Sequence, residues 1–167
     1  MRALVLSVFL GILTATQALA GGDFTFKYGL GFGLPQQKGV AEVKLFEVGY
    51  QRPLTSVLHH KFGLGLWADT RTGDGKRKSA GYTSYSLGVR VEPGPFYLES
   101  YWGVALITGT DSLLSTLFEF TGDLAVGARD SKGRFLGVSY KHFSNAGIKN
   151  PNRGRDFFLV NVGFPVW

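Results

Sequence analysis

The chain has 167 residues, a formal net charge of +6 and no cysteine. The length fits a single domain, and the lack of cysteine excludes a fold that disulfides hold together. Glycine is frequent, at 24 residues, and aromatic residues make up 14%. With few helix-like segments, this composition indicates an all-β protein.

The first segment, residues 1–20, has the pattern of a secretory signal. Arg2 precedes an apolar run of roughly 11 residues, which is well short of the ~20 needed for a transmembrane helix, and the segment closes on the small residues ALA. We therefore expect residues 1–20 to be a signal peptide and residues 21–167 to be the exported domain. Because an exported protein rarely meets nucleic acid, we expect no such partner, and an anionic membrane surface better explains the positive charge.

The following segments alternate between apolar and polar or small residues, beginning with FTFKYGLGFGL. Most are about 10 to 13 residues long, whereas ordinary strands average about 5 to 6 residues and tilted membrane-spanning strands need about 9 to 11. This pattern predicts an all-β fold, an eight-stranded antiparallel transmembrane β-barrel. The strands are expected at residues 24–34, 41–53, 58–70, 81–92, 95–107, 117–129, 134–145 and 156–166.

The connections between these segments alternate in length. LTSV, PG and DSKG are short, whereas PQQKGV, RTGDGKRKSA, TGTDSLLST and AGIKNPNRGR are longer. Outer-membrane barrels have short turns in the periplasm and longer loops at the cell surface. The final aromatic residue, Trp167, resembles the signal that the outer-membrane assembly machinery binds, so this machinery and outer-membrane lipid are expected partners.

Each predicted strand has one apolar face and one face of small and charged residues. A charged interior is stable if lipid surrounds the barrel and the ions pair inside. Around Leu45 and Glu47 this pattern breaks, which indicates a β-bulge. The charges expected to face inward are Lys27, Arg90, Glu99, Glu119, Asp123 and Lys141.

Other residues are expected at the membrane interface. His59 and His60 lie beside a short turn without acidic or cysteine neighbours, which favours interfacial side chains over a metal site. The GKRK segment at residues 75–78 is either a solvated loop tip or, with Lys149, Arg153 and Arg155, a cationic attraction for lipid phosphates. Trp67, Tyr82, Trp102 and Trp167 are expected in aromatic girdles at the two interfaces.

The stretch HFSNAGIKNPNRGRD contains the residue types of a nucleophilic triad. His142 and Ser144 share the lipid-facing side of one strand, and Asp156 has the same orientation on the next, at the same height. A serine hydroxyl becomes nucleophilic when an imidazole accepts its proton and a carboxylate orients that imidazole. Asn152, or the backbone N–H groups of Ala146 and Gly147, could donate hydrogen bonds to an oxyanion. The alternative is a polar loop whose side chains contact lipid headgroups.

The same stretch resembles the signature of the PagL-type lipid A 3-O-deacylases: His, an aromatic residue, SNAG, Pro-Asn, and an acid two positions after a Gly. The resemblance places the catalytic base at His142, the nucleophile at Ser144 and the acid at Asp156. It departs at the last position, where a glutamate is known in the family and an aspartate has a shorter reach. Asn145, Gly147, Pro151, Asn152 and Gly154 also match.

The resemblance implies an outer-membrane serine esterase that removes the ester-linked 3-O acyl chain from the lipid A of lipopolysaccharide. Its active site would lie at the outer leaflet of a Gram-negative outer membrane, with no metal and no other cofactor, and Asn152, Asn145 and Gly147 would position the substrate or oxyanion. Two alternatives stay open. One is a non-enzymatic small barrel, adhesive or structural, of the OmpX kind, and the other is a soluble periplasmic barrel that binds a ligand.

Overall fold

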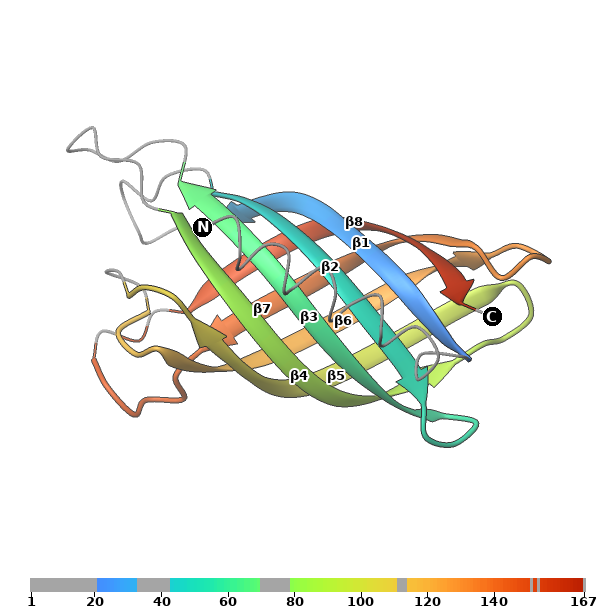
Figure 1. Ribbon diagram of the computed structural model, residues 1–167, viewed down its shortest axis with the longest axis horizontal. Helices are drawn as coiled ribbons and strands as arrows, with labels where there is room; N and C mark the ends of the chain where they lie inside the picture. The colour runs from blue at the N-terminus through green and yellow to red at the C-terminus, as the bar shows by residue number, and fades with distance from the viewer. Residues whose placement is uncertain are drawn as a thin grey trace, which may run out of the picture.

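The computed structural model describes residues 21–32, 43–69, 79–110, 114–150, 152 and 154–166. These residues form eight antiparallel strands, each paired with its neighbours in the chain, and β1 pairs with β8 to close the barrel (Figure 1). The predicted fold class is confirmed, with strand bounds close to those expected. The strands are β1 (Gly22–Phe32), β2 (Val43–Pro53), β3 (Leu58–Asp69), β4 (Ser79–Val91), β5 (Phe96–Ile107), β6 (Phe118–Arg129), β7 (Phe135–Ser144) and β8 (Arg155–Val166).

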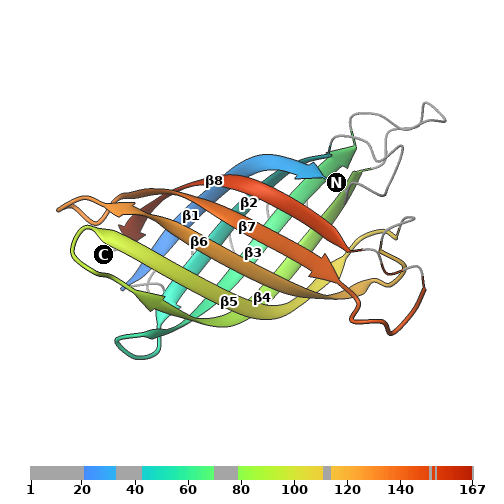
Figure 2. The same ribbon diagram turned by 180° about the vertical axis from the view of Figure 1, so that it is seen from behind.

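The two ends of the barrel differ in their connections. Tight turns join β2 to β3, β4 to β5 and β6 to β7 at one end, called here the short-turn end (Figures 1 and 2). In one of these turns Asp130 Oδ1 accepts the backbone N–H groups of Lys132 and Arg134, each at 2.9 Å. The opposite end, called the long-loop end, carries the connections between β1 and β2, β3 and β4, β5 and β6, and β7 and β8. Within the described residues there is no helix long and apolar enough to span a membrane.

The barrel has an apolar exterior and a charged interior. Leucine, valine and aromatic side chains are exposed on every strand, whereas the six charged residues expected inside are all buried. Lys27 and Lys61 both contact Asp123 Oδ2, at 2.6 and 2.8 Å, and Lys141 contacts Glu47. Because buried ions are stable only when paired, and an apolar exterior is unstable in water, this arrangement is that of a membrane-spanning barrel.

Part of the interior is apolar, which the sequence pattern did not predict. Trp67, Tyr82, Phe143 and Phe157 meet inside the barrel near the long-loop end, with ring centroids 5.0 to 5.4 Å apart for the contacts of Phe143 with Tyr82 and Trp67. We call these four residues the lumenal aromatic cluster. The expectation that Trp67 and Tyr82 form interfacial girdles is therefore wrong, since they are only 3% and 4% exposed. Trp102 is 67% exposed on the exterior, and Trp167 lies outside the described residues.

The bulge expected near Leu45 is also absent from the described part of β2. The strand pairs in unbroken register with β1 and with β3 from Val43 to Gln51. Leu45 and Glu47 both point inward and are fully buried. The pattern seemed to break because the inward face of β2 passes from the apolar cluster to the ion network, so two inward residues differ in polarity.

Candidate active site

β7 and β8 place the predicted site on the outside of the barrel, at the long-loop end. The antiparallel register sets His142 directly opposite Asp156. Lys141 and Phe143, the inward neighbours of His142, are buried. Because side chains alternate along a strand, His142 and Ser144 both project outward, next to lipid-facing residues.

His142 and Asp156 are in direct contact. The imidazole Nδ1 lies 2.7 Å from Asp156 Oδ1. Because an ionised carboxylate can only accept hydrogen bonds, Nδ1 is the donor and Nε2 is left as the basic nitrogen. The Asp156 side chain is only 9% exposed, whereas the imidazole side chain is 36% exposed. Although an aspartate side chain is shorter than a glutamate, Asp156 reaches His142 because the two residues are directly opposite each other across the strand pair.

Ser144 ends β7, two residues after His142 on the same face, and pairs with Phe120 of β6. In the part of the chain that the structure describes, no hydrogen bond joins its hydroxyl to the imidazole. Contacts of this kind are often long in the absence of substrate and tighten in the reactive complex. The structure therefore brings together the histidine and the acid, and sets the serine beside them without a bond.

The loop after Ser144 is organised by Asn145, which is fully buried. Its Nδ2 donates to Ser115 Oγ at 3.0 Å and to the Lys149 carbonyl at 2.7 Å. Its Oδ1 accepts the Gly147 N–H at 3.0 Å. Asn145 thus holds the loop, and the Gly147 N–H is already bonded inside it.

Asn152 completes this loop from the other side. Its Oδ1 accepts the backbone N–H of Asn145 at 2.9 Å, and it forms a β-bridge with Leu114. With the amide oxygen occupied, the NH₂ group is the end of the side chain that could donate to another molecule. Ala146, between Ser144 and Gly147, has a φ of 52°, which is uncommon for a residue other than glycine and marks local backbone strain.

Gly154 lies against the imidazole, a contact that the sequence pattern did not predict. Its φ is +70°, and a Cβ built there would be 2.7 Å from Cε1 and 3.5 Å from Nε2 of His142. Only glycine fits both the backbone conformation and the space. The backbone of Gly154 therefore forms one wall of the histidine site.

Tyr140 also belongs to the site and was not singled out from the sequence. It precedes His142 by two residues on the same face of β7, and its hydroxyl donates to Asp156 Oδ1. The only sequence signal was this shared parity, which many lipid-facing aromatic residues also have. The hydrogen bond depends on the β7–β8 register, which the sequence pattern does not predict.

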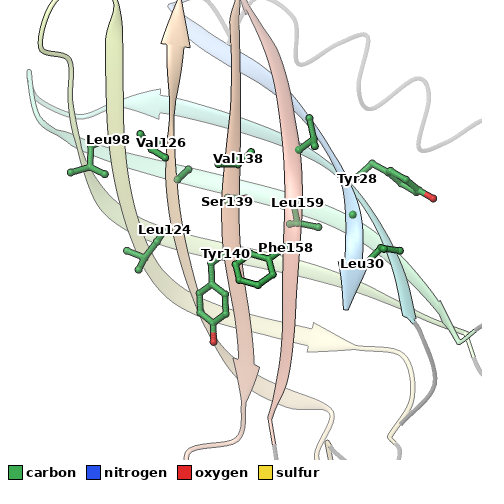
Figure 3. Close-up of a pocket in the computed structure, with 13 residues that line it drawn as sticks. Tyr28, Leu30, Leu98, Leu124, Val126, Val138, Ser139, Tyr140, Phe158 and Leu159 are labelled. Carbon is green, nitrogen blue, oxygen red and sulfur yellow. The ribbon is translucent and has the colours of Figure 1, made fainter. Parts of the chain in front are cut away.

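An apolar groove runs along the outside of β5 to β8 and β1, next to Tyr140 (Figure 3). Its volume is about 860 Å³. Its walls are lipid-facing side chains, and smaller or inward-facing residues such as Gly29, Ala125 and Ser139 form its floor. The residues that form its walls include Tyr28, Leu98, Leu124, Val138, Tyr140 and Phe158.

Of the basic residues expected near the site, the structure buries Arg155 and exposes Lys149. Arg155 is buried and its guanidinium lies 5.8 Å from the Trp67 ring centre, so it points into the barrel rather than toward a lipid surface. Lys149 is exposed. Arg153, Pro151 and residues 75–78 lie outside the described residues. His59 and His60, at the start of β3, are half-buried at the short-turn end, and His60 packs 5.5 Å from Phe62.

The fold and the site together define a class: a membrane-type β-barrel with a histidine–carboxylate pair and a neighbouring serine on its outer wall. The family model described as Lipid A 3-O-deacylase (PagL) matches residues 44–165, and the chain belongs to this family.

Two curated relatives match part of the chain. The Lipid A deacylase PagL of Bordetella bronchiseptica is 36% identical over 72 residues, which are 41% of this chain and 40% of that protein. The Lipid A deacylase PagL of Pseudomonas aeruginosa is 32% identical over 73 residues, 42% of each chain. These matches therefore span about two fifths of the length of the curated relatives.

Solved structures support the fold alone, because their sequence identities are low. The crystal structure of the outer membrane enzyme PagL has a TM-score of 0.65 at 19% identity, and the match covers 86% of this chain and 99% of that one. A designed transmembrane β-barrel has a TM-score of 0.57 at 13% identity, covering 86% and 95%. The Yersinia pestis outer membrane protein Ail has a TM-score of 0.50 at 11% identity, covering 86% and 99%.

Proposed function

We propose that this protein is an outer-membrane serine esterase that removes the 3-O acyl chain from lipid A, the reaction that gives its family its description. The observation that carries the proposal is the 2.7 Å contact between His142 and Asp156 on the apolar outer wall, with Ser144 beside it. A polar pair on a lipid-facing surface is costly unless it is used. A lipid-linked ester in the adjoining leaflet is the substrate that such a position can reach.

In this proposal Ser144 attacks the ester carbonyl while His142 Nε2 accepts its hydroxyl proton. Asp156 holds the imidazole in the required tautomer and stabilises its charged form. Collapse of the tetrahedral intermediate forms an acyl-serine and releases the sugar hydroxyl, which takes the proton from His142. Water, activated by the same imidazole, then hydrolyses the acyl-serine, which releases the fatty acid and restores Ser144.

The oxyanion would be bound by donors around Ser144. The NH₂ group of Asn152 is one candidate, since its oxygen is bonded to the Asn145 backbone, and the Ala146 N–H is another. Because the Gly147 N–H donates to Asn145 Oδ1, we assign Asn145 and Gly147 to holding the loop. The apolar groove beside Tyr140 would receive the acyl chain of the substrate.

The same proposal assigns residues 1–20 to a signal peptide that export removes, with residues 21–167 as the barrel. The short-turn end would face the periplasm and the site would lie in the outer leaflet. The outer-membrane assembly machinery would insert the barrel. Cell fractionation and amino-terminal sequencing of the mature protein check these assignments, with Gly21 as the expected first residue.

Ser144→Ala tests the enzymatic role. Lipid A from cells that express the wild-type protein should lose the mass of one acyl chain, and lipid A from cells that express Ser144→Ala should keep it, because no nucleophile remains. Mass spectrometry of the lipid A measures this, and heat-modifiable gel mobility should show that both barrels are folded. Unchanged lipid A mass with the wild-type protein would instead favour a non-enzymatic barrel, and full activity of Ser144→Ala would exclude this nucleophile.

A further inference from the structure

We propose that Tyr140 is a positioning residue of the active site, which fixes the carboxylate of Asp156 so that it orients His142. The inference rests on the proposed function, since it assigns a role within that reaction. Among the described residues, the Tyr140 hydroxyl hydrogen-bonds to Asp156 and not to Ser144 or His142, so the proposed role acts through the acid.

One carboxylate oxygen joins the three side chains. Tyr140 lies two residues before His142 on β7, and its hydroxyl donates to Asp156 Oδ1. His142 Nδ1 contacts the same oxygen at 2.7 Å. The register sets His142 directly opposite Asp156 and Tyr140 opposite Phe158. The imidazole therefore reaches the acid directly across the strand pair, and the phenol reaches it diagonally.

The surroundings of Asp156 explain why a second donor is needed. The carboxylate projects toward the lipid side of the barrel, where an ion is costly unless hydrogen bonds satisfy it. Tyr140 and His142 supply two donors, and with them in place Asp156 is only 6% exposed. The Tyr140 ring packs on Phe158, with centroids 5.7 Å apart, and lines the end of the apolar groove. The ring therefore separates the carboxylate from an acyl chain in that groove.

The orientation of the Tyr140 side chain distinguishes a role in positioning Asp156 from a role in packing against the substrate. In Figure 3 the Tyr140 hydroxyl points along β7 toward the carboxyl end of the strand, away from the groove residues Val138 and Leu98. The ring faces the groove and the hydroxyl faces the acid. Replacing only the hydroxyl therefore changes the orientation of Asp156 and leaves the groove wall intact.

Tyr140→Phe is the direct test, with purified protein in detergent and lipopolysaccharide as substrate. We expect kcat to fall about 10-fold, as for the loss of a hydrogen bond to a charged group, with KM unchanged because the ring remains. Tyr85→Phe is the matched control, since Tyr85 is a half-exposed tyrosine on the exterior of β4 that packs on Phe62. It should leave both constants unchanged.

A double-mutant cycle tests whether Tyr140 acts through the acid. In an Asp156→Ala background, Tyr140→Phe should cause no further loss, because the two groups work as one unit. An equal loss in both backgrounds would mean that the Tyr140 hydroxyl acts independently of Asp156 and would overturn the proposal. An unchanged kcat for Tyr140→Phe in the natural background would overturn it as well.

A spectroscopic measurement separates this inference from the proposed function. The chain has three histidines, so proton NMR of the ¹⁵N-histidine-labelled barrel can assign the low-field Nδ1 proton of His142 by its loss in His142→Gln. Tyr140→Phe should shift this resonance and Tyr85→Phe should not. A wild-type protein that releases no fatty acid would refute the proposed function, while the resonance would still decide the contact: no shift in Tyr140→Phe overturns the positioning role.

Discussion

At the scale of single residues, the site depends on close contacts of the His142 imidazole that leave no space for a larger side chain at Gly154. Asp156 is opposed to His142 across the strand pair, so an aspartate suffices where a longer acid would be expected. Gly154 approaches the imidazole from the other side with a positive φ. The imidazole is therefore fixed by a carboxylate at Nδ1 and by a backbone wall near Cε1.

Gly154→Ala should lower activity more than it lowers stability. A Cβ 2.7 Å from Cε1 must displace the imidazole, and a shift of a few tenths of an ångström in a catalytic base is expected to cost about 10-fold or more in kcat. Gly94→Ala is the control: Gly94 also has a positive φ, +66°, but nothing lies within 4 Å of its built Cβ. Lipopolysaccharide deacylation and thermal unfolding of both variants measure the difference. Equal losses of activity would show that backbone strain alone is responsible.

At the scale of elements, β7 connects the site to the barrel interior. Tyr140, His142 and Ser144 project outward, whereas Lys141 and Phe143 project inward. Lys141 contacts Glu47 of β2, and Phe143 packs within the lumenal aromatic cluster. The end of β7 that carries His142 and Ser144 is thus held from inside the barrel by an ion pair and by ring packing, and its outer surface is left open to the proposed substrate.

Phe143→Ala should therefore affect both stability and activity. Removing a fully buried ring leaves a cavity, and the free energy of unfolding is expected to fall by about 3–5 kcal/mol. Because Phe143 lies between His142 and Ser144, kcat should fall as well. Phe62→Ala removes an equal ring from the exterior of β3, where lipid or detergent fills the space. Denaturant unfolding in micelles compares the two, and equal destabilisation would contradict an interior role for Phe143.

At the scale of the whole molecule, polarity is inverted relative to a water-soluble protein. The interior holds pairs such as Lys27 with Asp123 and Arg90 with Asp23, and the exterior presents leucine, valine and aromatic side chains. This inversion is stable only where lipid or detergent covers the exterior. It also explains how the polar cluster of His142, Ser144 and Asp156 can face a lipid from the side rather than from the aqueous mouth of the barrel.

A charged residue on the outer surface of β3 should destabilise the barrel if that surface contacts the bilayer. Leu64, in the middle of β3, is 57% exposed, and Leu54, in a turn at the short-turn end, is 54% exposed. Leu64→Arg should destabilise the barrel in lipid vesicles by about 2–4 kcal/mol, as for arginine near a bilayer midplane. Leu54→Arg should cost much less because it stays in water. Denaturant titration of the two refolded variants gives the comparison, and similar costs would argue against a transmembrane position for β3.

Much of the fold follows from sequence periodicity alone. The two-residue alternation fixed which side chains of β4, β5 and β6 face lipid and which charges lie inside, because a strand offers only two faces and the exterior must be apolar. The same parity placed His142, Ser144 and Asp156 on one face, and their positions at the end of one strand and the start of the next placed them at one height. Where the inward face of one strand changes from apolar to charged, as between Leu45 and Glu47, polarity does not identify the face, and there the predicted bulge was wrong.

The sequence by itself determined the alternation along each strand, the order of strands and the residues that carry the family signature, since these are local or compositional properties. Only the tertiary structure decided the contacts across strands: the Nδ1–Oδ1 pair, the phenol of Tyr140 on the same oxygen, the wall formed by Gly154, and the aromatic cluster that buries Trp67 and Tyr82. These depend on the register between residues far apart in the chain and on how the barrel closes. Neither can be inferred from a strand considered alone.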